Sequence, residues 1–284
     1  MQVGVGLPNI IPGTPGRAII EWGREAERVG FSSIATIGRL TFPTVEELVA
    51  LAAVAAVTER IGLVTNTLIA PARDPAELAK QSASVDVLSG GRLTLGLAVG
   101  WREDDFTVTG RPFEERGRRF DEDLEVIHRA WAGETVRGSW HPVSPRPTNG
   151  KVPIVIGGTV PAAFERAAKW GIGWTAGGVP PDAASGYFEQ ARAAWRAAGR
   201  DDEPRLIALT YYGWGDRARE RARDYLVPYY GDYGEQMAAS IAVGPDEVRT
   251  TVEAFRQIGT DELILDPTTA DREQLEALAR AVLD

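Results

Sequence analysis

The feature that most constrains the fold of this chain is a regular alternation of short apolar runs with amphipathic stretches. Eight runs have the length and the two-sided apolar character of parallel strands that are covered on both faces. They are Gln2–Leu7, Ser33–Ile37, Ile61–Asn66, Leu93–Val99, Pro153–Ile156, Gly173–Ala176, Leu206–Tyr211 and Glu262–Leu265. Eight strands that are each followed by a helix favour an α/β fold of the (β/α)8 (TIM) barrel type over an open sheet.

Helical patterns fill the intervals between these runs. Arg116–Trp131 carries a repeating apolar face, and Asp74–Pro75 and Gly244–Pro245 resemble helix starts. We expect three longer pieces to be irregular insertions: Arg102–Glu115, Gly133–Lys151 and Asp232–Gly244. Because no linker rich in Pro, Gly or Ser interrupts the pattern, we expect one domain, residues 1–284, with insertions at the C-terminal face of the barrel.

The composition argues against several classes of function. A formal net charge of −9 disfavours nucleic acid or an anionic membrane surface as a partner. There is no cysteine, and the two histidines, His128 and His141, are far apart in the sequence, so we expect no metal site. No apolar run is long enough to span a membrane, and the N-terminus lacks the pattern of a signal peptide, so we expect a cytoplasmic protein.

The active site of a (β/α)8 barrel lies at the C-terminal ends of its strands. The residues that follow the expected strands are few in acids and bases, which indicates that a bound cofactor carries the chemistry. Aromatic residues of the later segments either line an apolar pocket above the barrel or pack the insertions onto it. The candidates at the strand ends are Asn9, Arg39, Asn66, Thr67, Gly100, Trp101, Asp104, Gly157, Gly158, Thr159, Gly177, Gly178, Tyr212, Trp214 and Asp266.

Two glycine-rich stretches need separate interpretation. In "IVIGGTVP", a buried strand ends at Gly157–Gly158, and Thr159 precedes a helix start at Pro161. Free N–H groups at a helix start bind phosphate, but the same residues also make an ordinary tight turn, and the residues alone do not decide between these. In "GVGLPN", the third glycine of a dinucleotide fingerprint is missing, and Pro8 would break the helix that must follow, so we reject that interpretation.

The stretch Thr58–Trp131, together with "IVIGGTVPAAFERAAKWGIGW" and "DELILDPT", resembles the bacterial luciferase-like superfamily. Its members are flavin-dependent monooxygenases and coenzyme F420-dependent oxidoreductases built on a (β/α)8 barrel. The resemblance implies a non-prolyl cis peptide bond at Asn66–Thr67 behind the central ring of the cofactor. It also implies that Gly100 and Trp101 lie where the fourth strand passes this ring, with Asp104 near the cofactor's side chain.

The resemblance assigns the cofactor's phosphate to the loop at Gly157, Gly158 and Thr159, and further cofactor contacts to Gly177 and Gly178. Three departures from relatives bear on the cofactor. Arg39 stands where many relatives have histidine, Trp101 where F420-dependent dehydrogenases have a carboxylate, and Val99 where luciferase has an arginine for the flavin phosphate. Arginine stays charged and cannot act as a general base, but it could hold an anionic group.

We therefore expect an FMN-dependent monooxygenase that uses reduced flavin and O2 on a small, largely apolar organic substrate, with Arg39 and Trp101 as its catalytic residues. The alternatives are F420-dependent hydride transfer and, in a different class, a flavin-binding protein without turnover. A barrel hydrolase that uses Asp104 and Asp266 is a distant third. The expected partners are the small-molecule substrate, a separate flavin reductase and a second copy of the chain in a homodimer.

Overall fold

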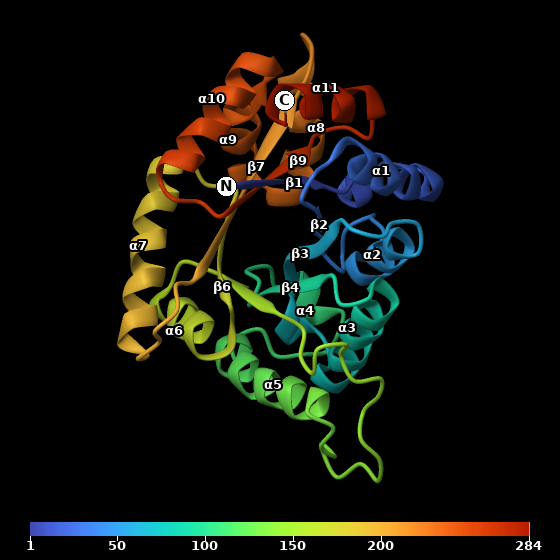
Figure 1. Ribbon diagram of the computed structural model, residues 1–284, viewed down its shortest axis with the longest axis vertical. Coiled ribbons are helices and arrows are strands. Elements are labelled where there is room, and N and C mark those ends of the chain that lie inside the picture. The colour runs from blue at the N-terminus through green and yellow to red at the C-terminus, as the bar shows by residue number, and fades with distance from the viewer. Residues whose placement is uncertain (284) are drawn as a thin grey trace.

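Parallel strands close into a barrel in the computed structural model, which describes residues 1–283 (Figure 1). Around the ring the strand order is β1, β2, β3, β4, β5, β6, β7 and β9, and β9 pairs with β1. These strands are β1 (Gln2–Gly6), β2 (Ser33–Thr36), β3 (Gly62–Ile69), β4 (Leu93–Ala98), β5 (Ile154–Gly157), β6 (Gly173–Gly177), β7 (Arg205–Gly213) and β9 (Glu262–Pro267). The expected (β/α)8 barrel is therefore confirmed.

Helices surround the strands in Figure 1, and the segment after α5 projects at the bottom of that view. The helices are α1 (Gly16–Val29), α2 (Glu47–Ala55), α3 (Pro75–Ser89), α4 (Asp104–Thr107), α5 (Arg116–Trp131), α6 (Pro161–Trp170), α7 (Pro181–Ala197), α8 (Ala218–Tyr230), α9 (Asp232–Ser240), α10 (Gly244–Gln257) and α11 (Arg272–Val282). No helix among residues 1–283 combines the length and the apolar character that a membrane crossing requires.

The side chains of each strand alternate between the barrel interior and the surrounding helices. One core cluster holds Ala35, Val64, Val155, Ile207 and Ile264, which come from five different strands and fill the interior. Their neighbours along the chain, such as Leu263 and Leu265, belong to the larger cluster under the helices. This alternation fixes which residues at the strand ends face the mouth of the barrel.

Local signals in the sequence explain where several helices begin. The side chain of Asp74 accepts hydrogen bonds from the backbone N–H groups of Ala76 (2.9 Å) and Glu77 (3.2 Å), and Pro75 occupies the first turn of α3. These contacts satisfy donors that have no partner inside the helix. The predicted helix start at Asp74–Pro75 is confirmed, as is the start of α10 at Gly244.

Several strands extend beyond their expected ends, β3 by three residues and β7 and β9 by two each. The register of β3 against β4 shifts between Thr65 and Leu68, and the strand then continues to Ile69. The polar pair Asn66–Thr67 lies within this bulge, so a pattern that ends at Asn66 underestimates the strand. β7 extends because its end pairs with a short additional strand, β8 (Ala242–Val243), which the sequence did not predict.

The expectation that Asp232–Gly244 is irregular is wrong. Residues Asp232–Ser240 form α9, and α8 and α9 pack against one another. The string Gly-Asp-Tyr-Gly at the start of this segment resembles a loop, but its glycines serve the packing. Gly231 has a positive φ of 65° between the two helices, and a Cβ at Gly234 would overlap the carbonyl oxygen of Leu226.

Candidate active site at the mouth of the barrel

The C-terminal ends of β3, β4, β5 and β6 form a wall of small side chains. A Cβ placed on Gly157 would lie 3.1 Å from Thr67 Cγ2, 3.5 Å from Thr175 Cγ2 and 3.7 Å from the Cβ of Ala98. These four residues therefore meet at one place, and none of them has a side chain larger than threonine. Thr175 and Gly157 are buried, and Thr67 and Ala98 are partly exposed. Because a flat ring needs a surface without protruding side chains, the exposed side of this wall fits the isoalloxazine group of a flavin or deazaflavin.

The bulge of β3 lies within this wall. The peptide bond between Asn66 and Thr67 is cis, as the resemblance implies. Asn66 is 5% exposed, and its Oδ1 accepts a hydrogen bond from Thr175 Oγ1 (2.8 Å) across the barrel interior. Its Nδ2 is buried without a hydrogen-bond partner. A buried donor of this kind is costly unless a ligand or water completes it, so Asn66 fits a site for a ligand with acceptor atoms.

The loop after β5 forms a second part of the site. Gly158 has φ +128°, a conformation that favours glycine, and its carbonyl oxygen accepts a hydrogen bond from Trp174 Nε1 (2.8 Å). Thr159 is exposed, and Pro161 begins α6. The ring of Trp174 thus fixes the loop, while the exposed Thr159 hydroxyl lies beside the start of α6, where it could bind an anionic group. Pro161 has no N–H, and the N–H of Ala163 donates to the carbonyl oxygen of Val160 (2.9 Å).

The other predicted cofactor residues lie around the same wall. Gly100 has φ +71°, and its carbonyl oxygen accepts a hydrogen bond from Arg116 Nε (3.1 Å). Trp101 is 60% exposed, and the guanidinium of Arg102 lies 4.3 Å from the centre of its ring. The predicted contacts of Gly100 and Trp101 with a cofactor stay predictions.

Gly177 ends β6, and Gly178 follows it. Gly177 is exposed, and a Cβ on it would meet no atom within 4 Å. Gly178 has φ +61°, and a Cβ on it would lie 2.5 Å from Cε of Met237 in α9. Gly177 therefore faces open space, and Gly178 marks the boundary at which α9 begins to cover the mouth.

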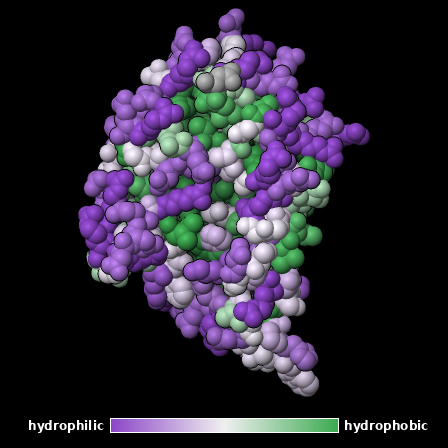
Figure 2. Space-filling view, in the orientation of Figure 1, coloured by the Kyte–Doolittle hydropathy of each residue, from purple (hydrophilic) through white to green (hydrophobic). Residues whose placement is uncertain are grey.

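The remaining half of the mouth, above β7, β9, β1 and β2, is covered by α8 and α9. Tyr211, Tyr225, Tyr229 and Met237 are buried in the same cluster as the barrel interior. The hydroxyl groups of Tyr211 and Tyr230 are hydrogen-bonded at 2.8 Å. Figure 2 shows apolar side chains (green) among hydrophilic ones (purple) toward the middle of the face in view. The aromatic residues thus pack an insertion onto the barrel, one of the two expected roles.

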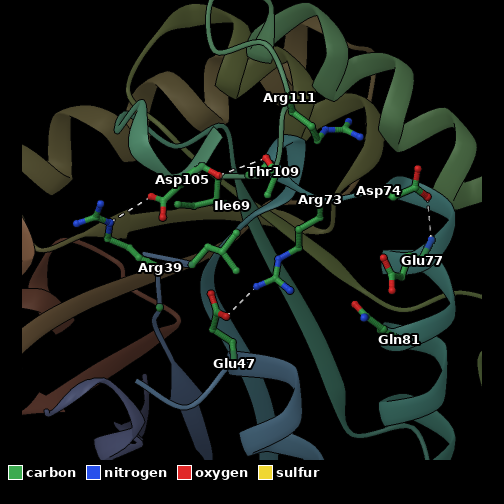
Figure 3. A pocket seen from close by; sticks show the side chains of 13 residues that line it. Arg39, Glu47, Ile69, Arg73, Asp74, Glu77, Gln81, Asp105, Thr109 and Arg111 are labelled. Carbon is green, nitrogen blue, oxygen red and sulfur yellow. Dashed lines mark hydrogen bonds and ion pairs between the residues drawn. The ribbon is translucent and has the colours of Figure 1, made fainter. Parts of the chain in front are cut away.

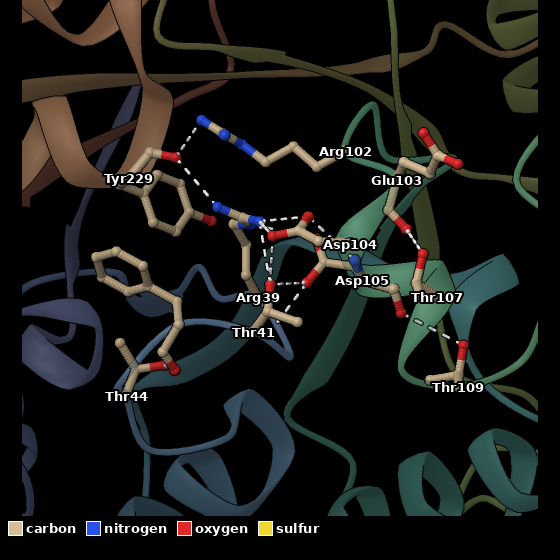
Figure 4. A network of polar contacts seen from close by, with 11 residues as sticks. Arg39, Thr41, Thr44, Arg102, Glu103, Asp104, Asp105, Thr107, Thr109 and Tyr229 are labelled. Atoms are coloured by element: carbon tan, nitrogen blue, oxygen red, sulfur yellow. Dashed lines mark hydrogen bonds and ion pairs between the residues drawn. The ribbon is translucent and has the colours of Figure 1, made fainter.

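Arg39 is the centre of a polar network that joins three segments of the chain (Figure 4). Its Nε donates to Asp105 Oδ2 (3.1 Å), its Nη2 donates to Asp104 (2.7 Å) and to Thr41 Oγ1 (3.1 Å), and its Nη1 donates to the carbonyl oxygen of Tyr229 (3.4 Å). The side chain of Arg39 is 7% exposed and that of Asp105 is 1% exposed. Arg39 therefore connects the loop after β2, the start of α4 and the end of α8.

This placement changes how two predicted residues are understood. Burial raises the pKa of Asp104, but hydrogen bonds from Thr41 and Arg39 outweigh it and hold that pKa below its usual range. Asp104 is thus a carboxylate engaged by Arg39, and all three guanidinium nitrogens of Arg39 already donate hydrogen bonds. A direct role for either residue toward a ligand stays a prediction. The sequence did not identify Asp105 as a buried partner, because "EDD" has the composition of a solvated run.

A cavity of about 500 Å³ lies beside this network, between the loop after β2, the start of α3 and the segment after α4 (Figure 3). Its charged groups are largely paired: Arg39 with Asp105, Arg73 with Glu47 (2.9 Å), and Arg111 with Asp123 (2.6 Å). Burial raises the pKa of Glu47, although Arg73 acts against this effect. The cavity is therefore polar, unlike the small-residue wall.

His128 lies in α5, away from the mouth. Its ring stacks on Trp170 with centroids 5.0 Å apart, and burial lowers its pKa. The ring of His128 therefore packs against neighbouring side chains, far from the candidate site.

Comparisons with known proteins agree with this geometry. Residues 1–277 match the family described as luciferase-like monooxygenase. An uncharacterised protein of Mycobacterium tuberculosis is 33% identical over 189 residues, which cover 64% of this chain and 65% of that protein. The 4-hydroxyprotoasukamycin monooxygenase of Streptomyces nodosus subsp. asukaensis is 30% identical over 213 residues, 68% of this chain and 56% of that enzyme. The chain thus spans less than two thirds of the length of these relatives.

A third relative, the FMNH2-dependent dimethylsulfone monooxygenase of Pseudomonas putida, is 29% identical over 128 residues, 41% of this chain and 35% of that enzyme. Among solved structures, monooxygenase RslO1 of Streptomyces bottropensis superposes with a TM-score of 0.80 at 23% identity, covering 100% of this chain and 99% of that one. An F420-dependent secondary alcohol dehydrogenase superposes with a TM-score of 0.83 at 17% identity, covering 99% and 98%. At these identities the two structures show a shared fold.

Proposed function

Because the chain belongs to the luciferase-like monooxygenase family, we propose that it is an oxidoreductase that binds reduced FMN at the mouth of its barrel and oxygenates a small organic molecule with O2. The observation that carries the proposal is the wall of Thr67, Ala98, Gly157 and Thr175 beside the loop at Gly158. The names of two relatives, a monooxygenase and an FMNH2-dependent monooxygenase, support flavin and oxygen over F420.

The residues of the chain would bind, orient and shield the cofactor. The small side chains of the wall leave room for the flat ring, and Asn66 Nδ2 offers an unpaired donor to its acceptor atoms. Gly158, Thr159 and the start of α6 would hold the phosphate. Reduced flavin supplies electrons to O2, so the part of the chain is to position the substrate and to exclude water from the ring.

The half of the mouth that α8 and α9 cover is suited to excluding water from the ring. Tyr211, Tyr225, Tyr229 and Met237 place apolar surface next to the wall, so a substrate at the boundary would be largely desolvated. The proposal extends to partners: a separate reductase would supply reduced FMN, and two copies of the chain would associate.

The proposal is tested by titrating the protein with FMN, with reduced FMN under anaerobic conditions, and with F420, following cofactor absorbance and fluorescence. We expect saturable binding of FMN or its reduced form, with the reduced form bound more tightly. Saturable binding of F420 alone would replace oxygenation with hydride transfer. If neither FMN nor F420 binds, the protein is neither an FMN-dependent monooxygenase nor an F420-dependent oxidoreductase.

A further inference from the structure

Asp266 is a buried acid at the end of β9 that no step of the proposed function uses. It pairs in register with Tyr211 of β7, and it lies two residues after Ile264, which fills the barrel interior. Because side chains two apart on a strand share a face, the carboxyl group points into the barrel at its C-terminal end. The residue is 2% exposed.

The barrel makes a specific space for this carboxyl group. Gly6 of β1 is its neighbour, and a Cβ on Gly6 would overlap Asp266 Oδ1. The "GVG" stretch near the N-terminus, which lacks the third glycine of a dinucleotide fingerprint, thus has a structural role. A glycine at residue 6 is what allows an acid at residue 266.

The carboxyl group of Asp266 has no compensating partner. Its Oδ2 is buried without a hydrogen bond, and no ion pair involving Asp266 occurs within residues 1–283. The titratable groups that face it are hydroxyls, whose pKa values a charge on Asp266 would raise: those of Tyr211 and Tyr212 from β7 and of Tyr225 and Tyr230 from α8. Burial therefore raises the pKa of Asp266 well above its ordinary value.

A second polar group beside Asp266 also lacks a partner. The hydroxyl of Tyr225 is buried without a hydrogen bond, although the neighbouring hydroxyls of Tyr211 and Tyr230 bond to each other. Buried polar groups are almost always paired in proteins, so the Asp266 carboxyl and the Tyr225 hydroxyl are both available to bind a ligand.

We propose that Asp266 is an uncharged carboxylic acid that donates a hydrogen bond to an acceptor oxygen of the substrate, and that it selects apolar molecules bearing a carbonyl or phenol oxygen. A protonated carboxyl has one O–H donor, and the Tyr225 hydroxyl can donate a second hydrogen bond to the same oxygen. An anionic ligand would find no cation beside Asp266. A hydrocarbon would leave the Asp266 carboxyl and the Tyr225 hydroxyl without a hydrogen-bond partner. The inference deepens the proposed function and rests on its placement of the substrate at the barrel mouth.

The substrate would reach Asp266 from the open half of the mouth. Met237 of α9 stands against Gly178 at the boundary between the two halves. A ligand that extends from the wall toward Asp266 would therefore pass this boundary.

The protonation state is tested by infrared difference spectra of the wild type against Asp266→Asn at neutral pH. We expect the substitution to remove the carbonyl stretch of an un-ionised carboxyl group. The control is Asp105→Asn, which removes a buried aspartate that is paired with Arg39 and should remove carboxylate bands only. Loss of carboxylate bands in Asp266→Asn would overturn the proposal.

The pH dependence of stability gives an independent check. The pKa of Asp266 is higher in the folded protein than in the unfolded chain, so the folded state retains a proton that the unfolded state releases above about pH 4. The wild type should therefore lose stability relative to Asp266→Asn as the pH rises above that value. If the thermal unfolding midpoints of the wild type and Asp266→Asn differ by the same amount at every pH from 4 to 8, the pKa of Asp266 is not raised in the folded protein.

The ligand class is tested with acetophenone and ethylbenzene, which are similar in size and differ in the carbonyl oxygen. Binding to the protein without added cofactor is measured by calorimetry, so the result does not depend on the cofactor assignment. We expect the wild type to bind acetophenone about tenfold more tightly, as one net hydrogen bond allows, and Asp266→Ala to reduce this ratio to near one. Equal or absent binding of both probes by the wild type, or an unchanged ratio in a folded Asp266→Ala protein, would overturn the assignment.

Discussion

Replacement of Arg39 with alanine is expected to destabilise the fold by about 3–5 kcal/mol, because it leaves a buried carboxylate without its cationic partner. Asp105 is 1% exposed, and Arg39 is the only cation with which it forms an ion pair in the part of the chain that the structure describes. The substitution also removes the hydrogen bonds that join the loop after β2 to Asp104 and to the end of α8. Chemical denaturation followed by circular dichroism measures the loss.

A double-mutant cycle separates the ion pair from the packing of the arginine stem. Asp105→Asn removes the buried charge, so Arg39→Ala should cost much less in that background than in the wild type. Arg39→Lys keeps the charge but cannot reproduce the hydrogen bonds of three guanidinium nitrogens, so we expect an intermediate loss. Full stability of Arg39→Ala would show that the network does not hold these loops together. A stable Arg39→Ala protein without turnover would instead support the catalytic role predicted for Arg39.

The second large effect is expected at the loop after β5. Gly158→Val places a branched side chain at φ +128° and a Cβ 3.0 Å from that of Ala163, so the loop must change shape. If this loop holds the phosphate, the loss of its charge-assisted hydrogen bonds should weaken FMN binding by about 10- to 100-fold. Thr159→Ala removes one hydroxyl donor and should have a smaller effect. Fluorescence titration with FMN measures both.

The control for backbone strain is Gly199→Val, because Gly199 also has a positive φ (71°) and a Cβ there would meet no atom within 4 Å. It follows α7, whereas Gly158 follows β5. Gly199→Val should lower stability without changing the dissociation constant for FMN. If Gly158→Val and Gly199→Val bind FMN with equal affinity, the loop at Gly158 is a structural turn only.

The barrel could be predicted from the sequence because its strands are buried on both faces and therefore appear as continuous apolar runs. Three parts were missed, and each depends on packing that a local sequence pattern does not show: β8, α9 and the short helix α4 within Arg102–Glu115. β8 has two residues, and it exists because Tyr212 and Gly213 of β7 provide an edge for it. α9 follows a glycine-rich start, and its packing against α8, with a glycine beside Leu226, is visible only in three dimensions.

The strand-end rule found Thr67 and Gly157 of the wall and the loop at Gly158 and Thr159, since position along a strand decides which residues reach the mouth. It missed Ala98 and Thr175, which lie inside the expected strands and reach the wall only through the packing of the barrel. It could not show how side chains at the mouth pair with one another. Asp104 and Asp105 look alike in the sequence, yet one is half exposed and the other is buried against Arg39. Likewise, Asp266 was a candidate by position, but its isolation from every cation follows from the packing of α8 and α9.

The most direct test of the central claim is a crystal structure of the protein with FMN bound. We expect density for the isoalloxazine ring against Thr67, Ala98 and Gly157, with the phosphate at Gly158 and Thr159. Density for the ring in the cavity lined by Arg73 and Glu47, or at any place away from the ends of β3 to β6, would contradict the assignment of the active site.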